Sequence, residues 1–389
     1  MLKGAFPIDS FKGRKTPFYF YDMDLLQRTL EEIKLQAGRF PGFRVHYAVK
    51  ANSNPEILRV IAEAGLGADC VSGGEVAAAY AAGFPPDTIV FAGVGKTDED
   101  IRLGLRLGIS RFNVESEAEL EVIDSLAKEA GTVAPVSIRV NPDIGAHTHA
   151  NITTGLAENK FGIFHEELEA VLRKVLRMEH VSFCGLHFHI GSQILDMADF
   201  VALCNRVNEI TAKLKRCSLP VGDINVGGGL GINYQHPNHL DIADFKSYFE
   251  TFARHLELEQ GQTVHFEPGR SVVAPCGTLI SKVLYVKKGV TRQFAILDAG
   301  MTELIRPALY NAYHRVENLS SSEEEELYDV VGPICESSDV FGKGLSIDRC
   351  HRGDYIAIRS VGAYGECMAS RYNLRPLAES VFYRKQISG

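Results

Sequence analysis

The sequence predicts an α/β barrel of eight parallel strands, a TIM-type (β/α)8 barrel, joined to a second, mostly antiparallel β domain. The chain has 389 residues, which suits a barrel of about 250 residues plus a domain of about 120. Eight short β-rich runs alternate with helical patterns, and this alternation is typical of parallel βαβ units. Three consecutive glycines follow the seventh run, where barrels often bind phosphate. An open doubly wound sheet would usually place them after the first strand.

The eight β-rich runs can be read directly along the first two thirds of the chain. They lie at residues 43–50, 67–72, 88–93, 111–114, 134–141, 181–190, 223–229 and 263–268. Between them, apolar residues recur at spacings of three and four, as in NPEILRVIAEAG and EELEAVLRKVLRM, which indicates amphipathic helices. We therefore expect strand and helix to alternate eight times.

The pattern changes after about residue 272. Runs such as TLISKVLYVKK and DYIAIRSVGAYG are rich in β-forming residues and are joined by turns. The early run TPFYFYD is a further strand that we expect to pair with this second domain. The expected domains are residues 25–272 for the barrel, and residues 1–24 with 273–389 for the β domain.

Composition narrows the classes of function. The formal net charge of −8 disfavours a nucleic acid or an anionic membrane as the partner. Eight cysteines are scattered without a CxxC pair, which is unlike a disulfide framework. No run of about 18 apolar residues and no signal peptide pattern is found. We expect a cytoplasmic protein that acts on a small molecule.

The barrel prediction selects candidate site residues, because side chains at the C-terminal ends of barrel strands face the active site. The selected residues are Lys50, Asp69, Arg139, His187 or His189, Gly227, Gly228, Gly229, and Glu267 with Arg270. A lysine in an apolar strand is costly unless it is paired or used covalently, so Lys50 is a candidate Schiff-base lysine. The alternative is a surface lysine that extends to solvent. The glycines could cradle a phosphate or form only a tight turn.

The EPGR segment places a carboxylate and a guanidinium at the end of the eighth strand. Arg270 could bind a phosphate or carboxylate through two hydrogen bonds, and the alternative is a structural ion pair with Glu267. Cys335 and Glu336 in GPICESSD could form a proton-donating thiol beside a carboxylate, or Cys335 could be a buried structural cysteine.

A histidine metal site is a weaker interpretation. His187 and His189 lie two residues apart, and His147 and His149 have the same spacing. In the sequence, no cysteine or carboxylate ligand set accompanies these histidines, so no metal is expected. One imidazole could instead stack on the ring of a cofactor.

Ten motifs in order carry a resemblance to a known family. They are YAVKAN, GADCVSGGE, RVNPDIGAHTHANITTG, NKFGI, HFHIGSQI, GGGLGI, EPGR, LIRPALY, GPICESSD and GAYG. Together they resemble the fold-type III pyridoxal-phosphate decarboxylases that act on ornithine, lysine, arginine and diaminopimelate. Within that group the chain is similar to the diaminopimelate decarboxylases, and the resemblance runs from residue 16 to residue 376.

The resemblance implies pyridoxal 5'-phosphate as the cofactor and a role for each matching position. Lys50 would form the Schiff base, His189 would stack on the pyridine ring and Glu267 would pair with the ring nitrogen. The cofactor's other neighbours would be Asp69, Arg139, Ser192, Gly227, Gly228, Gly229, Gly269, Arg270 and Tyr364. The substrate would contact Arg270, Arg306, Tyr310, Glu336 and Tyr364. Cys335 would protonate the product carbanion, with Cys335 and Glu336 supplied by the partner subunit of a homodimer.

The implied reaction is decarboxylation of meso-2,6-diaminopimelate to L-lysine and CO2, the last step of lysine biosynthesis by the diaminopimelate route. Glu267 favours decarboxylation over racemisation, since a carboxylate keeps the ring nitrogen protonated. Arg306 favours diaminopimelate over ornithine, because a buried guanidinium facing a purely cationic substrate is unfavourable. Decarboxylation of ornithine, arginine or carboxynorspermidine, and a relative that binds the cofactor without catalysis, are the alternatives.

Overall fold

The computed structural model describes residues 4–144 and 160–385. The chain divides into two compact units. The barrel unit contains Leu30–Gly231 and Asp244–Gly269, and the β unit contains Met1–Thr29, Ile232–Ala243 and Arg270–Gly389. The domain limits expected from the sequence, at residues 25 and 272, stay a prediction. Most of the motif RVNPDIGAHTHANITTG, with His147 and His149, lies outside the described residues.

Within the described residues, eight parallel strands form the closed barrel that the sequence predicts. Their bounds are β2 (Phe43–Ala48), β3 (Gly67–Cys70), β4 (Ile89–Phe91), β5 (Arg111–Val114), β6 (Ala134–Asn141), β8 (Val181–His187), β9 (Asp223–Asn225) and β10 (Val264–Phe266). The strands pair in the order β5-β4-β3-β2-β10-β9-β8-β6, and pairing of β5 with β6 closes the barrel. A two-residue strand, β7 (Ile163–Phe164), also pairs with β6.

Several strands end earlier than the β-rich runs suggest. The expected strand 43–50 ends at Ala48, because the chain turns into the 3-10 helix η2 (Val49–Ala51). The run 181–190 ends at His187, and the run 223–229 ends at Asn225. Gly227 has φ +70°, a backbone conformation that leaves the strand ladder. The residues beyond these ends form the loops at the C-terminal face of the barrel.

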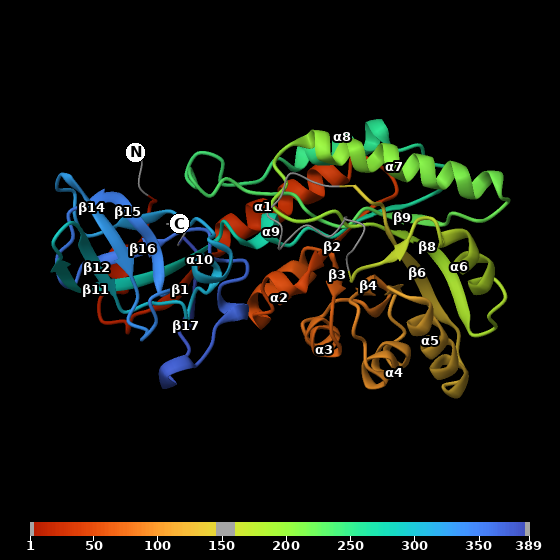
Figure 1. Cartoon of the computed structure of the whole chain (residues 1–389), viewed down its shortest axis with the longest axis horizontal. Helices are drawn as coiled ribbons and strands as arrows, with labels where there is room; N and C mark the ends of the chain where they lie inside the picture. The colour runs from red at the N-terminus through yellow and green to blue at the C-terminus, as the bar shows by residue number, and fades with distance from the viewer. Residues whose placement is uncertain (1–3, 145–159, 386–389) are drawn as a thin grey trace. The chain divides into compact units, whose positions relative to one another are not determined.

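Helix α1 (Met23–Ala37) precedes the first barrel strand, and further helices follow most of the barrel strands, as Figure 1 shows. The bounds of these helices are α2 (Pro55–Glu63), α3 (Gly73–Ala81), α4 (Asp98–Leu107), α5 (Glu117–Glu129), α6 (Leu168–Val175), α7 (Met197–Arg216) and α8 (Phe245–His255). Helices α2, α3 and α5 begin at polar N-cap residues: the side chains of Asn54, Ser72 and Ser116 each accept a hydrogen bond from a backbone N–H of the first turn. Thr97 and Asp100 form a complete capping box on α4.

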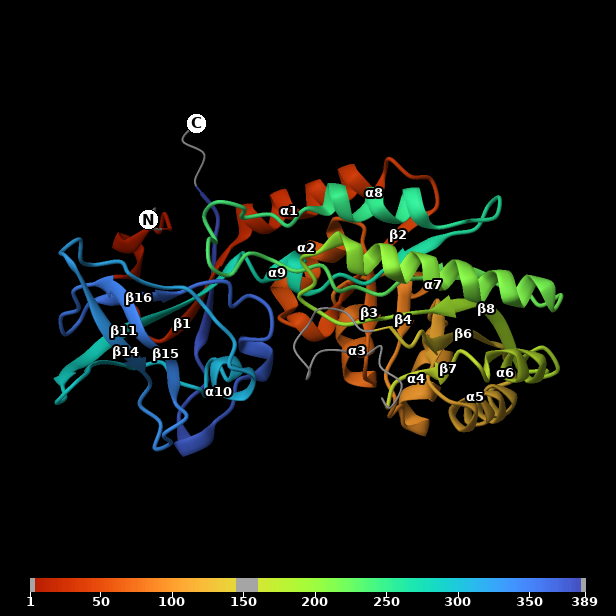
Figure 2. The ribbon, with the colours of Figure 1, turned by 45° about the horizontal axis from the view of Figure 1, so that its top comes forward.

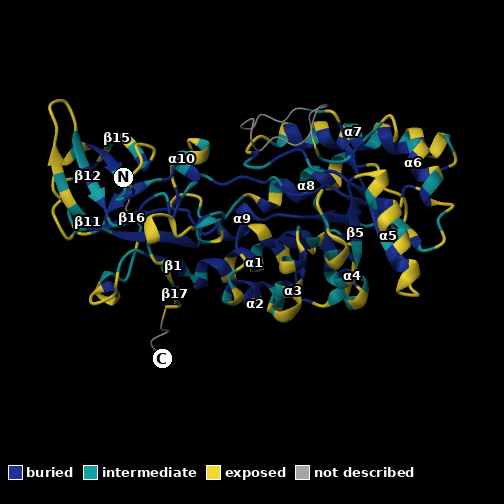
Figure 3. Ribbon diagram, turned by 60° about the horizontal axis from the view of Figure 1, so that its bottom comes forward, coloured by how far each residue is buried: buried dark blue, intermediate teal, exposed yellow. Residues whose placement is uncertain are grey.

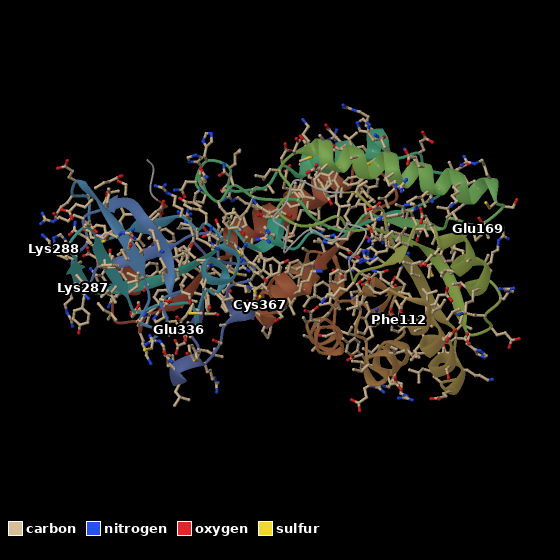
Figure 4. All side chains as sticks on the ribbon, viewed as in Figure 1. Phe112, Glu169, Lys287, Lys288, Glu336 and Cys367 are labelled. Carbon is tan, nitrogen blue, oxygen red and sulfur yellow. The ribbon has the colours of Figure 1, made fainter. Side chains whose placement is uncertain are left out.

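An aromatic cluster packs α7 and α8 against the barrel wall. The rings of Phe266 and Phe249 lie 4.9 Å apart, and Phe200 on α7 lies 4.9 Å from Tyr248 on α8. The two helices run side by side in Figures 1 and 2. Figure 3 shows barrel strands buried and helix faces alternating between buried and exposed, as expected for amphipathic helices. Phe112, labelled in Figure 4, is fully buried.

The β unit is built on a mainly antiparallel sheet. Its strands are β1 (Phe18–Asp22), β11 (Gly277–Lys288), β12 (Gln293–Leu297), β13 (Val316–Asn318), β14 (Glu325–Val331), β15 (Val340–Asp348), β16 (Tyr355–Ile358) and β17 (Glu379–Tyr383). The order is β13-β16-β11-β12-β14-β15, with β1 beside β11 and β17 beside β1. Only the β12–β14 and β1–β17 pairs of this sheet are parallel among the described residues. Antiparallel pairing of β1 with β11 confirms the position expected for TPFYFYD.

Short helices complete the β unit and the connections. They are α9 (Arg270–Val273), α10 (Arg306–Tyr310), and the 3-10 helices η1 (Ile8–Phe11), η3 (Pro86–Thr88), η5 (Glu366–Met368) and η6 (Tyr372–Leu374). Strand β11 ends in Lys287 and Lys288, which are labelled in Figure 4. In residues 4–144 and 160–385, no helix combines the length and the apolar character needed to cross a membrane.

Candidate active site

Lys50 lies at the C-terminal face of the barrel, directly after β2. Its Nζ lies 3.3 Å from Oδ2 of Asp69 on the neighbouring strand β3, and the lysine side chain keeps 40% of its surface exposed. Asp69 is buried, and burial raises its pKa to about 8. The charge of Glu267 acts in the same direction, whereas Lys50 opposes it. The amine is therefore held by a buried acid and still open to a reaction partner.

Glu267 follows β10 and lies inside a cage of hydrogen-bond donors. Its Oε2 lies 3.1 Å from Nε2 of His187, and its Oε1 accepts from Nδ2 of Asn225 at 2.6 Å and of Asn113 at 3.3 Å. Burial by itself raises the pKa of Glu267, but the interactions with His187, Lys50 and Asn225 outweigh it and hold the pKa below its usual range. This carboxylate is ionised at neutral pH.

His187 and His189 have different neighbours, although the sequence places them two residues apart. His187 ends β8 and contacts Glu267, whereas Nδ1 of His189 accepts the backbone N–H of Gly228 at 3.4 Å. Desolvation lowers the pKa of His189 well below its usual value, and the charges of Arg139 and Lys50 add to this effect. His189 is consequently a neutral ring beside the glycine run.

Arg139 on β6 is paired within the barrel. Its Nη1 donates to Oε1 of Glu115 at 2.7 Å, and its guanidinium carbon lies 4.6 Å from the ring centre of Phe161. Glu115 also accepts the backbone N–H groups of Gly93 and Gly162. Glu115 therefore ties Arg139 to two loops at the barrel mouth.

The glycine run brings backbone segments closer than side chains would allow. Gly229 has φ +110°, and a Cβ there would lie 2.9 Å from the carbonyl oxygen of Gly191. A Cβ on Gly228 would collide with the carbonyl group of Glu267, and one on Gly269 would press on Ala48 and Ala51. Ser192 lies in the adjoining loop after β8 and is partly buried. The N–H groups of Gly227 and Gly228 donate to Asn225 and His189, so Gly229 is the residue of this run whose backbone suits an anionic group.

A second group of candidate residues lies within the β unit. Arg270 starts α9 and Arg306 starts α10, and both side chains are buried. Their Nη1 atoms donate to the same phenol oxygen, that of Tyr234, at 2.7 and 2.9 Å. The ring of Tyr364 lies 4.9 Å from the guanidinium carbon of Arg270 and 6.0 Å from that of Arg306. Two cations are thus concentrated at one point, which favours an anionic ligand.

The remaining predicted residues lie at the ends of other elements of the β unit. Tyr310 ends α10 and is partly exposed. Cys335 and Glu336 are exposed in the loop between β14 and β15, so the interpretation of Cys335 as a buried structural cysteine is wrong. The backbone N–H of Cys335 donates to Asn373, and Tyr372 donates to Glu336 at 2.6 Å. Figure 4 labels Glu336 in the lower part of the β unit in that view.

The histidines do not form a metal centre in the part of the chain that the structure describes, where no group of three His, Cys, Asp or Glu side chains could hold an ion. His187 does have one carboxylate neighbour, Glu267. The carboxylate comes from a different strand, so sequence spacing could not reveal it.

Sequence reasoning missed several residues that support the site. Asn113 is the last residue but one of β5 and Asn225 ends β9, so the rule of barrel strand ends could have selected both. Glu115 stands directly after β5 and follows the same rule. Tyr234 had no comparable signal, because it lies in an irregular segment after the glycine run.

The part of the chain that contains the barrel shows to which class of proteins the chain belongs. Residues 26–274 match the family model described as "Pyridoxal-dependent decarboxylase, pyridoxal binding domain". The matched stretch carries the closed barrel, Lys50 and Glu267. The class is therefore that of the pyridoxal-dependent decarboxylases.

Comparisons over nearly the whole chain identify a family within this class. A diaminopimelate decarboxylase from Bacteroides thetaiotaomicron is 62% identical over 376 residues, which cover 97% of each chain. The structure of a diaminopimelate decarboxylase from Helicobacter pylori, complexed with L-lysine, has a TM-score of 0.90 and 40% identity, and covers 97% of this chain and 94% of that one. One from M. jannaschii, also with L-lysine, has a TM-score of 0.90 and 36% identity over 97% and 89% of the two chains. This chain belongs to the diaminopimelate decarboxylase family.

The barrel residues fit the cofactor of this class. Pyridoxal phosphate needs an amine, a partner for its ring nitrogen and a site for its phosphate. Lys50 offers an accessible amine, and the ionised Glu267 suits a protonated nitrogen. Among the described residues, the buried Oδ1 of Asp69 and Nδ1 of His187 have no hydrogen-bond partner. Such unsatisfied groups are typical of a site completed by a bound molecule.

Proposed function

We propose that this chain removes one carboxyl group from meso-2,6-diaminopimelate and releases L-lysine and CO2, the last step of lysine biosynthesis by the diaminopimelate route. The observation that carries the choice of substrate is the pair of buried guanidiniums, Arg270 and Arg306, that share the phenol oxygen of Tyr234. Diaminopimelate keeps a carboxylate and an ammonium group at the end that does not react, whereas ornithine has only an ammonium group there. Two buried cations suit the first substrate and repel the second.

The barrel residues would hold the cofactor and set its charge. Lys50 would bind it covalently, and Glu267 would keep a proton on the ring nitrogen. When bound, pyridoxal phosphate supplies an electron-withdrawing ring that accepts the electron pair of the bond broken at the substrate α-carbon. The neutral ring of His189 lies beside the glycine run and suits stacking on a flat cofactor, because it adds no charge. The backbone N–H of Gly229 and the side chain of Ser192 would contact the phosphate, while Gly227 and Gly228, whose N–H groups donate to Asn225 and His189, would let the loop approach closely.

Residues of the β unit would bind the substrate and supply the proton. Arg270 and Arg306 would take the distal carboxylate, and Glu336 would take the distal ammonium. The C–C bond to the departing carboxyl group breaks, and the thiol of Cys335 delivers a proton to the carbon that lost it. The resulting thiolate regains a proton from solvent. Tyr310 and Tyr364 would also contact the substrate.

We further propose a homodimer in which each subunit supplies Cys335 and Glu336 to the partner's site. Both residues are exposed in the single chain, which leaves them available to a second copy. The 3-10 helix η6, which is hydrogen-bonded to their loop, exposes Tyr372 by 48% and Leu374 by 97%, and Leu377, three residues further on, is 48% exposed. Exposed apolar side chains that gather in one segment favour a protein interface.

Two smaller proposals accompany this function. A cytoplasmic location is supported by the eight cysteines, which are scattered over both units in no disulfide framework. The limits of the cofactor domain are proposed at residues 25 and 272, close to the family match over 26–274. Cell fractionation and limited proteolysis test them.

The experiment that tests the proposed function is a substrate panel. Purified protein with pyridoxal phosphate is offered meso-diaminopimelate, ornithine, arginine and carboxynorspermidine separately, and CO2 and the amine product are measured. We expect CO2 and L-lysine from diaminopimelate alone. Turnover of another substrate would contradict the role of the arginine pair, and inactivity toward all four with the cofactor bound would favour a relative without catalysis.

A further inference from the structure

Tyr234 lies at the centre of the arginine pair, although it belongs to none of the motifs that identify the site. Its oxygen accepts one hydrogen bond from Arg270 and one from Arg306, at 2.7 and 2.9 Å. Its ring centre lies 6.0 Å from the guanidinium carbon of Arg270 and 5.5 Å from that of Arg306. The side chain of Tyr234 therefore contacts both guanidiniums, through hydrogen bonds to its oxygen and through cation–π contacts with its ring.

His314 fixes the orientation of Arg306 on the other side. Its Nδ1 lies 2.9 Å from the carbonyl oxygen of Arg359, so this nitrogen carries the proton and donates it. Its Nε2 then accepts from Nη1 of Arg306 at 3.3 Å. Burial lowers the pKa of His314 to about 3, and the charge of Arg306 adds to the effect, which keeps the ring a neutral acceptor. The ring also lies 5.1 Å from that of Tyr234, edge to face.

These contacts determine which donors of Arg306 remain for a ligand. Both hydrogens of its Nη1 are used, by Tyr234 and by His314. Among the described residues, its Nε and Nη2 make no hydrogen bond and no carboxylate pairs with it. The Nε and Nη2 edge of a guanidinium matches the two oxygens of a carboxylate. The arrangement therefore presents this edge in a fixed orientation.

We infer that Tyr234 is the positioning residue for the distal carboxylate of the substrate: its oxygen accepts from both guanidiniums and so holds them next to each other. Without the shared acceptor, two like charges this close repel each other and move apart. Both acceptor positions of the phenol oxygen are occupied by arginines, so its own O–H remains to donate. A carboxylate bound between the arginines is a suitable acceptor for that proton. This inference rests on the proposed function, because it explains how the same site recognises the carboxylate at the end of diaminopimelate that does not react.

The test compares two ligands that differ only in the carboxylate. L-lysine has the distal α-carboxylate, and 1,5-diaminopentane is the same chain without it. Their binding to cofactor-loaded wild type and Tyr234→Phe is measured by calorimetry, together with kcat and KM for meso-diaminopimelate. Loss of a hydrogen bond to a charged group weakens binding about tenfold or more. We expect that loss for L-lysine, unchanged affinity for 1,5-diaminopentane, and a KM raised about tenfold with kcat within about threefold of wild type.

Two further variants separate positioning from a general structural effect. Tyr355→Phe is the matched control, because its hydroxyl donates to the carbonyl of Phe11 in the apolar core of the same unit. It should leave the ratio of the two affinities unchanged. Tyr234→His keeps an acceptor on a ring and should restore part of the ratio. Equal weakening of both ligands by Tyr234→Phe, or no weakening of either, would overturn the inference. A wild type that binds both ligands but does not decarboxylate diaminopimelate would refute the proposed function separately.

Discussion

Nε2 of His187 lies 3.1 Å from Oε2 of Glu267 inside the barrel, and neither side chain is exposed. A carboxylate buried this deeply would normally take up a proton. The contact with His187, the charge of Lys50 and the amide of Asn225 reverse that tendency. His187 therefore helps to keep Glu267 ionised. Glu267 is the residue that we propose keeps a proton on the ring nitrogen of the cofactor.

Replacing His187 with alanine should change the pH dependence of turnover. Burial then dominates, and the pKa of Glu267 rises. Because only the ionised carboxylate keeps the ring nitrogen protonated, the acid limb of the kcat profile should move to higher pH, with kcat near neutral pH lowered about 10- to 100-fold. The profile of kcat against pH measures this. His255→Ala, at the end of α8, is the control, and an equal loss at every pH would argue against the role of His187.

Lys50→Ala should abolish the absorbance band of the lysine–cofactor Schiff base. Lys50 is the amine next to Asp69, and 40% exposure of its side chain leaves it open to the cofactor aldehyde. Titration with pyridoxal phosphate, followed by spectroscopy and by mass after borohydride reduction, measures the linkage. Lys128→Ala, on the exposed face of α5, should behave as wild type. A band that persists in Lys50→Ala would show that a different amine binds the cofactor.

Asp69→Asn should change how the stability of the cofactor-free protein depends on pH. Folded Asp69 keeps its proton up to pH about 8, whereas the unfolded chain releases it near 3.8. The contribution of Asp69 to the free energy of unfolding is therefore fully present below pH 3.8 and is lost as the pH rises to about 8. The melting temperature of wild type should therefore fall more steeply than that of Asp69→Asn between those values. Parallel curves for the two proteins would mean that Asp69 is ionised in the folded state.

Mixed subunits should show whether active sites are shared. Lys50→Ala and Cys335→Ala are each expected to have little activity alone. In a shared site, Lys50 of one subunit works with Cys335 of the other, so a mixed dimer has one intact site. Unfolding and refolding an equal mixture should recover about one quarter of wild-type activity. Sedimentation checks that dimers form, and a mixture as inactive as its components would place both residues in one chain.

The barrel could be predicted from the sequence because its signals are local. Each strand is a short apolar run, and polar N-caps such as Thr97 start the helix that follows. The strand limits could not be predicted in the same way, since Val49 and Lys50 continue the β-rich run but lie in a 3-10 helix beyond the end of the strand. Hydrophobic pattern does not encode that turn.

From residue types alone, the candidate site residues that stand out are those whose type is chemically unusual at their position. Lys50 and Glu267 stand out because charge is unusual at the end of an apolar strand. The partners of Glu267 could not be identified, since His187, Asn225 and Asn113 come from three strands that only the closed barrel brings together. Tyr234 was missed because a tyrosine in a loop is ordinary, and its meaning comes from two arginines distant in sequence.

The most direct test is the reaction of the purified, cofactor-loaded protein with meso-diaminopimelate in D2O. Breaking one C–C bond and placing one solvent proton on the same carbon predicts equal amounts of CO2 and L-lysine, with a single deuterium on the terminal carbon of the lysine. Deuterium exchanged into diaminopimelate without CO2 would instead indicate a racemase-like reaction. That result, or the absence of lysine while the cofactor is bound, would contradict decarboxylation by this site.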